Sequence, residues 1–238
     1  MAEHKCVNII LIETSTSLCS VALSQDGVIK SYRESAQTKA HASLTAPFVK
    51  EVLDECGLSI RECDAVCVSS GPGSYTGLRV GVSTAKGLCF GAGIPLLAVS
   101  TMDVLAEMGK NIECRFIVPM IDARRMEVYS AVYANSPAGR PHQISPIEPI
   151  VVDEHSFADR LAEGKVLFIG DGAEKCRELL ACDNAIFEQC CPSASAMARL
   201  AQKLFDEGKT EDVAYFEPFY LKEFQATIAK NKVLSRDL

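Results

Sequence analysis

The sequence contains no apolar run that could cross a membrane. Its longest apolar runs, residues 7–12 and 94–99, fall far short of the ~20 residues that a membrane-spanning helix needs. Residues 1–6 lead directly into the first of these runs, which leaves no room for a signal peptide. We therefore expect a cytoplasmic protein that has no membrane partner.

Motifs for a metal centre or a redox disulfide are also missing. None of the eleven cysteines belongs to a Cys-x-x-Cys pair, which excludes a zinc ribbon and a thioredoxin-type motif. The four histidines are His4, His41, His142 and His155, and no two of them have the three- or four-residue spacing of ligands on one helix. We therefore expect reduced, mostly buried cysteines and no metal ion bound by this chain.

The motifs of common nucleotide-binding and hydrolytic enzymes are incomplete. The chain has no P-loop. The run from Gly81 to Ala85 misses the Gly-x-Ser-x-Gly nucleophile elbow because its last residue is alanine. Ser83 and Lys86 have the Ser-x-x-Lys spacing of some serine acyl-enzymes, a pattern short enough to arise by chance. A peptidase stays an alternative on that pair alone.

Basic charge is scarce, since the net charge is −7 at pH 7. A protein that binds nucleic acid by itself needs a basic face. Basic residues gather in only two places, the pair Arg124-Arg125 and the C-terminal stretch with Lys222, Lys230, Lys232 and Arg236. We therefore expect contact with nucleic acid only indirectly, through a complex whose other members supply the basic surface.

The most informative part of the sequence is the glycine-rich stretch from Ser69 to Ile94. Residues 71–73 end an apolar strand at 65–68, and a helix is expected over 74–91. Small residues recur at every fourth position of this stretch: Gly73, Gly77, Gly81 and Ala85. Residues four apart lie on one ridge of a helix, and each interior glycine costs about 0.8–1 kcal/mol relative to alanine. A close neighbour must offset this loss, whether it is the chain's own sheet, a second protein or a ligand.

The order of predicted elements repeats once along the chain. Residues 1–33 are predicted to form a three-stranded antiparallel meander with a turn at Asp26-Gly27, followed by a helix over 38–57. A second strand–turn–strand pattern covers 116–133, with a further strand and helix over 166–180. This weak internal symmetry predicts two similar α/β halves, and two unrelated α/β domains are the alternative.

The predicted halves are lobes 1–109 and 110–213, with a segment 214–238 that packs back on the body. Their matching residues face a shared cleft, and the candidates are Glu13, Thr14, Gly71, Gly73, Asp122, Gly170 and Gly172. One interpretation is an actin-like ATPase or phosphotransferase with its nucleotide in this cleft, where Glu13 and Asp122 would hold Mg²⁺. The other is structural, with both carboxylates capping turns.

Four motifs resemble those of one known family, over essentially the whole chain. They are Ile12-Glu-Thr-Ser-Thr-Ser17, the run from Ser69 to Val82, Gly170-Asp-Gly172 and Pro218-Phe-Tyr-Leu-Lys222. The chain resembles the TsaB (YeaZ) family of bacterial tRNA threonylcarbamoyladenosine synthesis. The resemblance implies a two-lobed actin-like (ASKHA, RNase H-like) α/β fold, with mixed sheets flanked by helices.

The resemblance also implies a role without catalysis. Members of the TsaB family are non-catalytic partners of the catalytic paralogue TsaD, and together with the ATPase TsaE they add threonylcarbamoyl to an adenosine beside the tRNA anticodon. The paralogue carries a His-x-x-x-His metal pair, whereas the corresponding residues here are His41 and Thr45. The resemblance thus implies no catalytic residue in this chain, with ATP and a metal ion on partner subunits. The wider family's older label, glycoprotease, underlies the peptidase alternative.

In that family the first two helices of the N-terminal lobe form the pairing surface. They correspond to residues 38–57 and 74–91 here. The glycine ridge would then let a helix of TsaD, or of a second copy in a homodimer, lie close. The predicted contact residues are His41, Leu44, Phe48, Tyr75, Leu78, Arg79, Gly81 and Val82.

Overall fold

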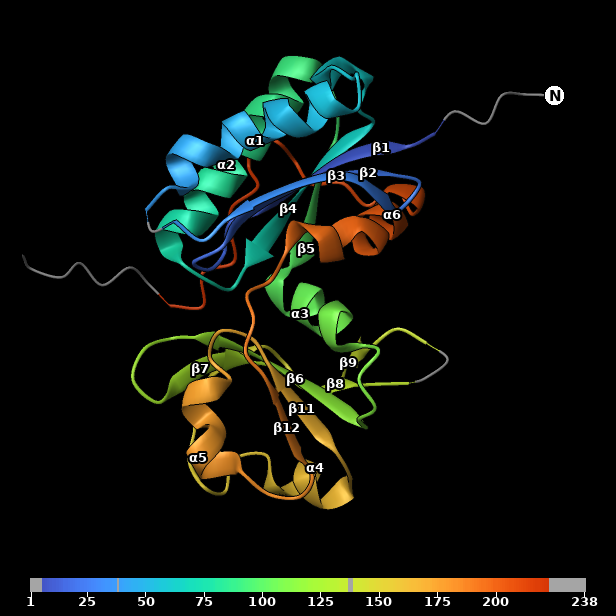
Figure 1. Ribbon diagram of the computed structural model, residues 1–238. Helices are drawn as coiled ribbons and strands as arrows, with labels where there is room; N and C mark the ends of the chain where they lie inside the picture. Colours follow the sequence, from blue (N-terminus) through green and yellow to red (C-terminus); the bar gives the residue numbers. More distant parts are fainter. Residues whose placement is uncertain (1–5, 38, 137–138, 223–238) are drawn as a thin grey trace, which may run out of the picture.

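A computed structural model describes residues 6–37, 39–136 and 139–222, and it shows two lobes, each built on one sheet (Figure 1). The first sheet has the order β3-β2-β1-β4-β5, with β1, β4 and β5 parallel and β2 and β3 antiparallel. Its strands are β1 (Asn8–Glu13), β2 (Cys19–Gln25), β3 (Val28–Ser35), β4 (Ala65–Gly71) and β5 (Leu96–Ser100).

The predicted meander is present and its turn has the expected chemistry. Asp26 and Gly27 have φ values of +50° and +73°, the left-handed pair that a two-residue type I′ hairpin requires. The Asp26 carboxylate also accepts a hydrogen bond from the Val7 amide at 2.9 Å. Every residue of β1 is buried, because helices cover both faces of this central strand.

Two helices cover the outer face of the first sheet. They are α1 (His41–Glu55) and α2 (Tyr75–Ala92), with the short 3-10 helix η1 (Ile60–Glu62) between them in sequence. Phe48 and Val52 of α1 and Val82 of α2 pack with Ile10 and Ile12 of β1. The opposite face packs on η3 (Ala194–Met197) and α6 (Ala198–Asp206), which come from the end of the chain.

The second sheet repeats the plan of the first, in the order β10-β7-β6-β11-β12 with β6, β11 and β12 parallel. Its strands are β6 (Phe116–Asp122), β7 (Glu127–Ser130), β8 (Tyr133–Ala134), β9 (His142–Gln143), β10 (Glu148–Val151), β11 (Val166–Ile169) and β12 (Ala185–Glu188). Beside it lie α4 (Ala158–Glu163), η2 (Glu174–Cys176) and α5 (Arg177–Leu180). The equal strand order confirms the predicted two-lobed actin-like α/β fold.

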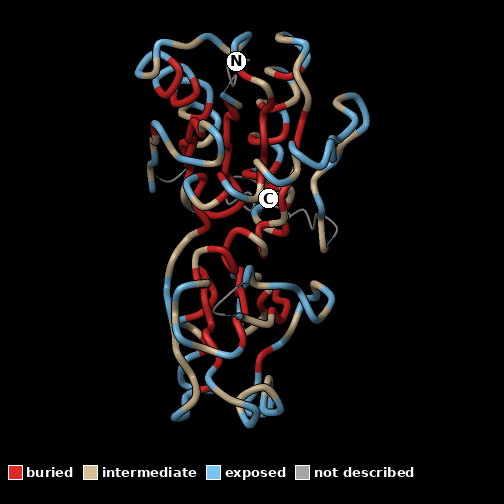
Figure 2. Tube along the Cα trace, turned by 90° about the vertical axis from the view of Figure 1, so that its right-hand side faces the viewer, coloured by how far each residue is buried: buried red, intermediate tan, exposed pale blue. Residues whose placement is uncertain are grey.

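The helix α3 (Thr101–Gly109) lies between the two sheets (Figure 1). Buried residues form the interior of each lobe (Figure 2). Met102 and Leu105 of α3 pack on Ile117 and Leu167 of the second sheet, while Val104 belongs to the core of the first lobe. Because α3 packs on both sheets and α6 packs on the first, the predicted boundaries 1–109 and 110–213 do not separate the packing units. Within the described part of the chain, no helix has the length and apolar character needed to cross a membrane.

The end of the described chain, residues 211–222, forms what we call the C-terminal strap. Glu211 donates its amide to Leu96 at 2.8 Å, and Phe219 donates its amide to Ser70 at 2.7 Å. Lys222 then forms an ion pair with Glu127 of the second lobe, so the strap connects both lobes. Residues 223–238 of the predicted segment 214–238 lie outside the described residues.

Candidate functional site

Glu13 ends β1 as a fully buried carboxylate. Its Oε1 accepts hydrogen bonds from the Ser15 amide at 2.6 Å and the Ser69 hydroxyl at 2.9 Å. Its Oε2 has no hydrogen-bond partner among the described residues, and burial raises the pKa of the carboxyl above its ordinary value. In this arrangement Glu13 fastens the β1–β2 turn to the end of β4, which is the structural interpretation of this residue.

The raised pKa of Glu13 predicts a pH-dependent stability. Above pH 4.5, the ordinary pKa of the group, the unfolded chain releases a proton that the folded chain keeps, so stability falls as the pH rises toward the folded pKa. Glu13→Gln removes this loss. Its stability relative to the parent protein should therefore increase by about 1.4 kcal/mol per pH unit within that window. Urea unfolding at a series of pH values measures the difference.

An exposed glutamate supplies the control for this measurement. Glu113→Gln should follow the parent protein at every pH, because Glu113 lies in solvent. A gap between Glu13→Gln and the parent that stays constant from pH 4.5 to 8 would contradict a raised pKa at Glu13.

The glycine ridge of α2 packs against its own lobe, so its predicted role as a docking surface is wrong. A Cβ on Gly77 would lie 2.1 Å from the carbonyl oxygen of Thr14, and one on Gly81 would lie 2.3 Å from Thr14 Oγ1. Thr14 Oγ1 also donates to the Gly77 carbonyl at 2.8 Å. The physical reason is the parallel pairing of β1 and β4, which brings the turn after β1 onto the helix after β4. The close neighbour is therefore the chain itself.

The glycines at the loop ends also serve packing within the chain. A Cβ on Gly73 would meet the Ser15 carbonyl oxygen at 2.3 Å, and one on Gly170 would meet the Met120 carbonyl oxygen at 2.2 Å. Gly71 has φ +109°, and a Cβ there would lie 2.7 Å from the Phe219 carbonyl oxygen of the strap. These glycines let neighbouring loops approach closely.

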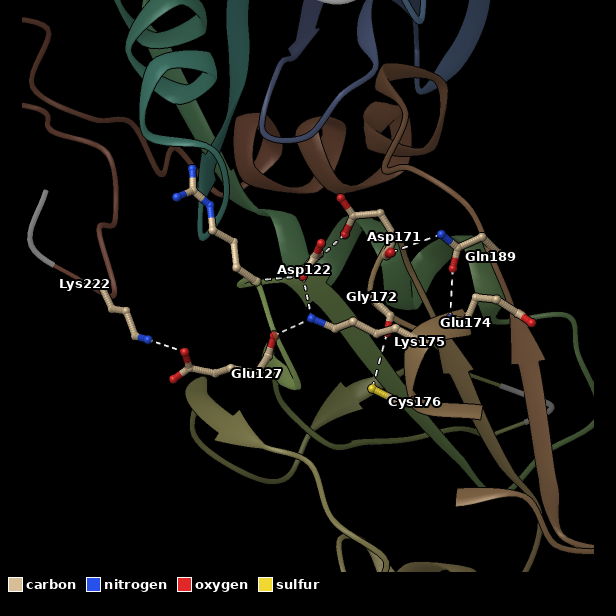
Figure 3. Close-up of polar contacts among 10 residues, drawn as sticks. Asp122, Glu127, Asp171, Gly172, Glu174, Lys175, Cys176, Gln189 and Lys222 are labelled. Atoms are coloured by element: carbon tan, nitrogen blue, oxygen red, sulfur yellow. Dashed lines mark hydrogen bonds and ion pairs between the residues drawn. The ribbon is translucent and has the colours of Figure 1, made fainter. Parts of the chain in front are cut away.

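Asp122 lies exposed at the end of β6 in a polar cluster (Figure 3). Its carboxylate accepts from the Arg124 amide at 2.8 Å and forms an ion pair with Lys175, while its own amide donates to Asp171 at 2.8 Å. Gly172 donates its amide to Met120 at 2.9 Å beside this cluster. The hydrogen bonds and ion pairs of Asp122 and those of Glu13 share no residue.

Two shallow hollows, of about 450 and 330 Å³, are lined mainly by residues of the first lobe, with Arg140 of the second lobe in the first hollow and Glu107 of α3 in the second. Arg140, Arg199 and Lys203 line the first, together with Asp26 and Asp206. Neither hollow is lined by any of the seven predicted cleft residues. Among the described residues, no group of three or more histidine, cysteine or acidic side chains is arranged to hold a metal ion.

The residues that carried the metal and peptidase hypotheses have other partners. His41 Nε2 lies 3.0 Å from the Thr16 carbonyl, and Thr45 Oγ1 donates to the His41 carbonyl at 2.7 Å. Lys86 Nζ donates to two carbonyls of the strap, at 3.1 and 3.0 Å, and so anchors the strap to α2. Ser83 lies exposed, and no hydrogen bond is formed between Ser83 and Lys86.

Four of the eight predicted contact residues are buried within the lobe, which corrects that prediction. Phe48, Leu78, Gly81 and Val82 belong to the interior. Arg79 is exposed, and His41, Leu44 and Tyr75 are partly buried. Tyr75 stacks on Tyr220 of the strap with ring centroids 4.7 Å apart. Only these four of the predicted set reach the surface.

A different side of α1 and α2 faces solvent, and we call it the outer face. Exposed Ser83, Gly87 and Gly91 form a second small-residue ridge on α2, and no atom would lie within 4 Å of a Cβ on either glycine. Phe90 beside them is 86% exposed. On α1 the exposed residues include Ala42, Ala46 and Pro47. The same four-residue spacing of Ser83, Gly87 and Gly91 is present in the sequence.

Comparisons with known proteins agree with the motifs. The family model described as TsaD, tRNA N6-adenosine threonylcarbamoyltransferase, matches residues 27–230. The chain is 33% identical to the tRNA threonylcarbamoyladenosine biosynthesis protein TsaB of Escherichia coli over 224 residues, which cover 91% of this chain and 95% of that protein. The TsaB of Haemophilus influenzae is 30% identical, with coverages of 91% and 94%.

A solved structure agrees as well. YeaZ from Pseudomonas aeruginosa superposes with a TM-score of 0.80 and 26% identity, over 90% of this chain and all of that one. The sequence relatives, the family model and this structure match the same chain almost from end to end. The chain therefore belongs to the TsaB (YeaZ) family of tRNA threonylcarbamoyladenosine biosynthesis proteins.

Proposed function

We propose that this chain is the non-catalytic scaffold and activator of the complex that adds threonylcarbamoyl to the adenosine next to the tRNA anticodon. It docks a TsaD-type catalytic subunit through the outer face of α1 and α2. ATP and the metal ion belong to the partner subunits, which include a TsaE-type ATPase, and the complex operates in the cytoplasm.

The observation that carries this proposal is the exposed Phe90 beside the small residues of the outer face. Phe90 is a large apolar side chain that is 86% exposed, and its contact with water is unfavourable. Covering it with a partner lowers the free energy. Ser83, Gly87 and Gly91 leave room for the backbone of a neighbouring helix. A helix of the partner can therefore pack closely here, with Phe90 in its contact.

A second copy of the chain fits the same face when the catalytic subunit is absent. A two-fold dimer buries the same patch on both subunits, so a self-complementary helical face is suited to it. Homodimer and heterodimer then compete for one surface. As the concentration of the TsaD-type subunit rises, the fraction of this chain in the homodimer should fall and the fraction in the heterodimer should rise.

Reconstitution tests this function directly. We expect a mixture of TsaD-type subunit, TsaE-type ATPase and tRNA to form threonylcarbamoyladenosine only when this chain is added, and the chain alone to form none. Equal rates with and without the chain would contradict the scaffold role. Tight binding of ATP with Mg²⁺ to the chain alone, measured by calorimetry, would favour the ATPase alternative instead.

A further inference from the structure

The structure brings Lys222 to the hairpin that carries the arginine pair Arg124-Arg125. Arg124 and Arg125 form the tip of the β6–β7 hairpin. Lys222, where the basic C-terminal stretch begins, reaches the same hairpin across the strap and pairs with Glu127 (Figure 3). On a chain with a net charge of −7, this hairpin thus carries a local group of basic residues.

The carboxylates around the hairpin are already paired with lysines. Asp122 pairs with Lys175, and Glu127 pairs with Lys222. The side chains of Arg124 and Arg125 are exposed and form no hydrogen bond or ion pair with a described residue.

The local charge follows from this pairing. The four cations Arg124, Arg125, Lys175 and Lys222 outnumber the carboxylates of Asp122 and Glu127 by two. Counting Asp171 as charged still leaves a net charge of +1. Among the described residues around the hairpin tip, the two arginines therefore leave an excess of positive charge.

The backbone of the hairpin tip is strained, because both arginines adopt a left-handed conformation. Arg124 and Arg125 have φ values of +72° and +52°. A left-handed conformation costs a non-glycine residue roughly 1–2 kcal/mol, and turns of this kind usually contain Asn-Gly. Strain of this kind concentrates at functional sites, where the surrounding structure holds it in place. Here the turn is held by bonds from Ala123 to Glu127 (3.0 Å) and from Glu127 to Arg124 (3.2 Å).

We propose that the arginine tip, Arg124 and Arg125, binds phosphate groups of the tRNA backbone directly. The guanidinium fork matches a phosphate in two parallel hydrogen bonds. Interfaces with nucleic acid are much more positively charged than interfaces between proteins, so an exposed arginine pair without a carboxylate partner fits the phosphates of an RNA backbone. The proposal rests on the proposed function, since the catalytic subunit supplies the rest of the tRNA surface, and it adds a direct contact to the indirect one expected from composition.

The test uses the assembled complex with TsaD-type subunit and a tRNA transcript as the probe. Arg124→Gln with Arg125→Gln is compared with Arg61→Gln with Arg199→Gln, a pair that is also exposed and forms no side-chain ion pair with a described residue. We expect the first variant to bind tRNA more weakly and to make the slope of log K against log salt shallower by about one to two. The control variant should retain both the affinity and the slope, whereas the charge-preserving Arg124→Lys with Arg125→Lys should keep the slope and lose part of the affinity, because lysine cannot form the two parallel hydrogen bonds.

Association with the TsaD-type subunit, measured by sedimentation, separates the outcomes. Unchanged association with a shallower salt slope supports the proposal. An unchanged tRNA affinity and slope would overturn it, and so would a loss of subunit association without loss of tRNA affinity, because the arginines would then contact a protein carboxylate. Failure of the proposed function is distinguishable, since the parent chain itself would then not support modification.

Discussion

Gly77→Ala should destabilise the protein by about 2–4 kcal/mol. The new Cβ would lie 2.1 Å from the Thr14 carbonyl oxygen, which belongs to the backbone of a buried turn and cannot move aside cheaply. Overpacking of this kind costs roughly 1–3 kcal/mol, and the hydrogen bond from Thr14 Oγ1 to the Gly77 carbonyl adds about 1 kcal/mol. Urea-induced unfolding measures the loss.

The same helix offers a matched control. Gly87 has no atom within 4 Å of the position of a Cβ and lies inside α2. Gly87→Ala should therefore stabilise the protein by about 0.8–1 kcal/mol, the ordinary difference in helix propensity. Equal effects of the two substitutions would contradict the packing of the inner ridge against the β1–β2 turn.

Ala46→Arg should weaken association with the TsaD-type subunit about thirtyfold or more and lower tRNA modification accordingly. Ala46 is exposed on α1 within the outer face, so arginine is tolerated by the folded chain. In a packed interface the added side chain and charge would cost roughly 2 kcal/mol or more, about a thirtyfold loss of affinity. Sedimentation and a modification assay with the purified mixture measure both effects.

Ala181→Arg is the control for this substitution, because Ala181 is exposed on the second lobe. It should bind the partner and support modification like the parent chain. Normal modification by correctly folded Ala46→Arg would contradict docking of the TsaD-type subunit through the outer face.

Local patterns predicted the elements of the fold well. The buried run of β1 and the Asp26-Gly27 turn specify the first hairpin, because both act within one stretch of chain. In the sequence, matching turns after the first strand of each half also indicate that the two halves share one strand order. The packing of α3 on both sheets and of α6 on the first sheet has no signal in the sequence, since no local pattern says which sheet an apolar helix face will cover.

The candidate site shows the same limit. The spacing of Gly73, Gly77, Gly81 and Ala85 correctly indicates a close neighbour, but periodicity does not identify that neighbour. Here it is Thr14, which is 63 residues from Gly77 in the sequence and is brought to it by parallel pairing. The left-handed backbone of Arg124 and Arg125 likewise had no signal in the sequence.

Hydrogen–deuterium exchange of this chain, with and without the TsaD-type subunit, tests the docking of α1 and α2 most directly. We predict that the partner slows exchange in peptides covering residues 42–47 and 83–91, while exchange in α4 and α5 stays unchanged. Slower exchange confined to the second lobe, with no change in these two helices, would contradict the account.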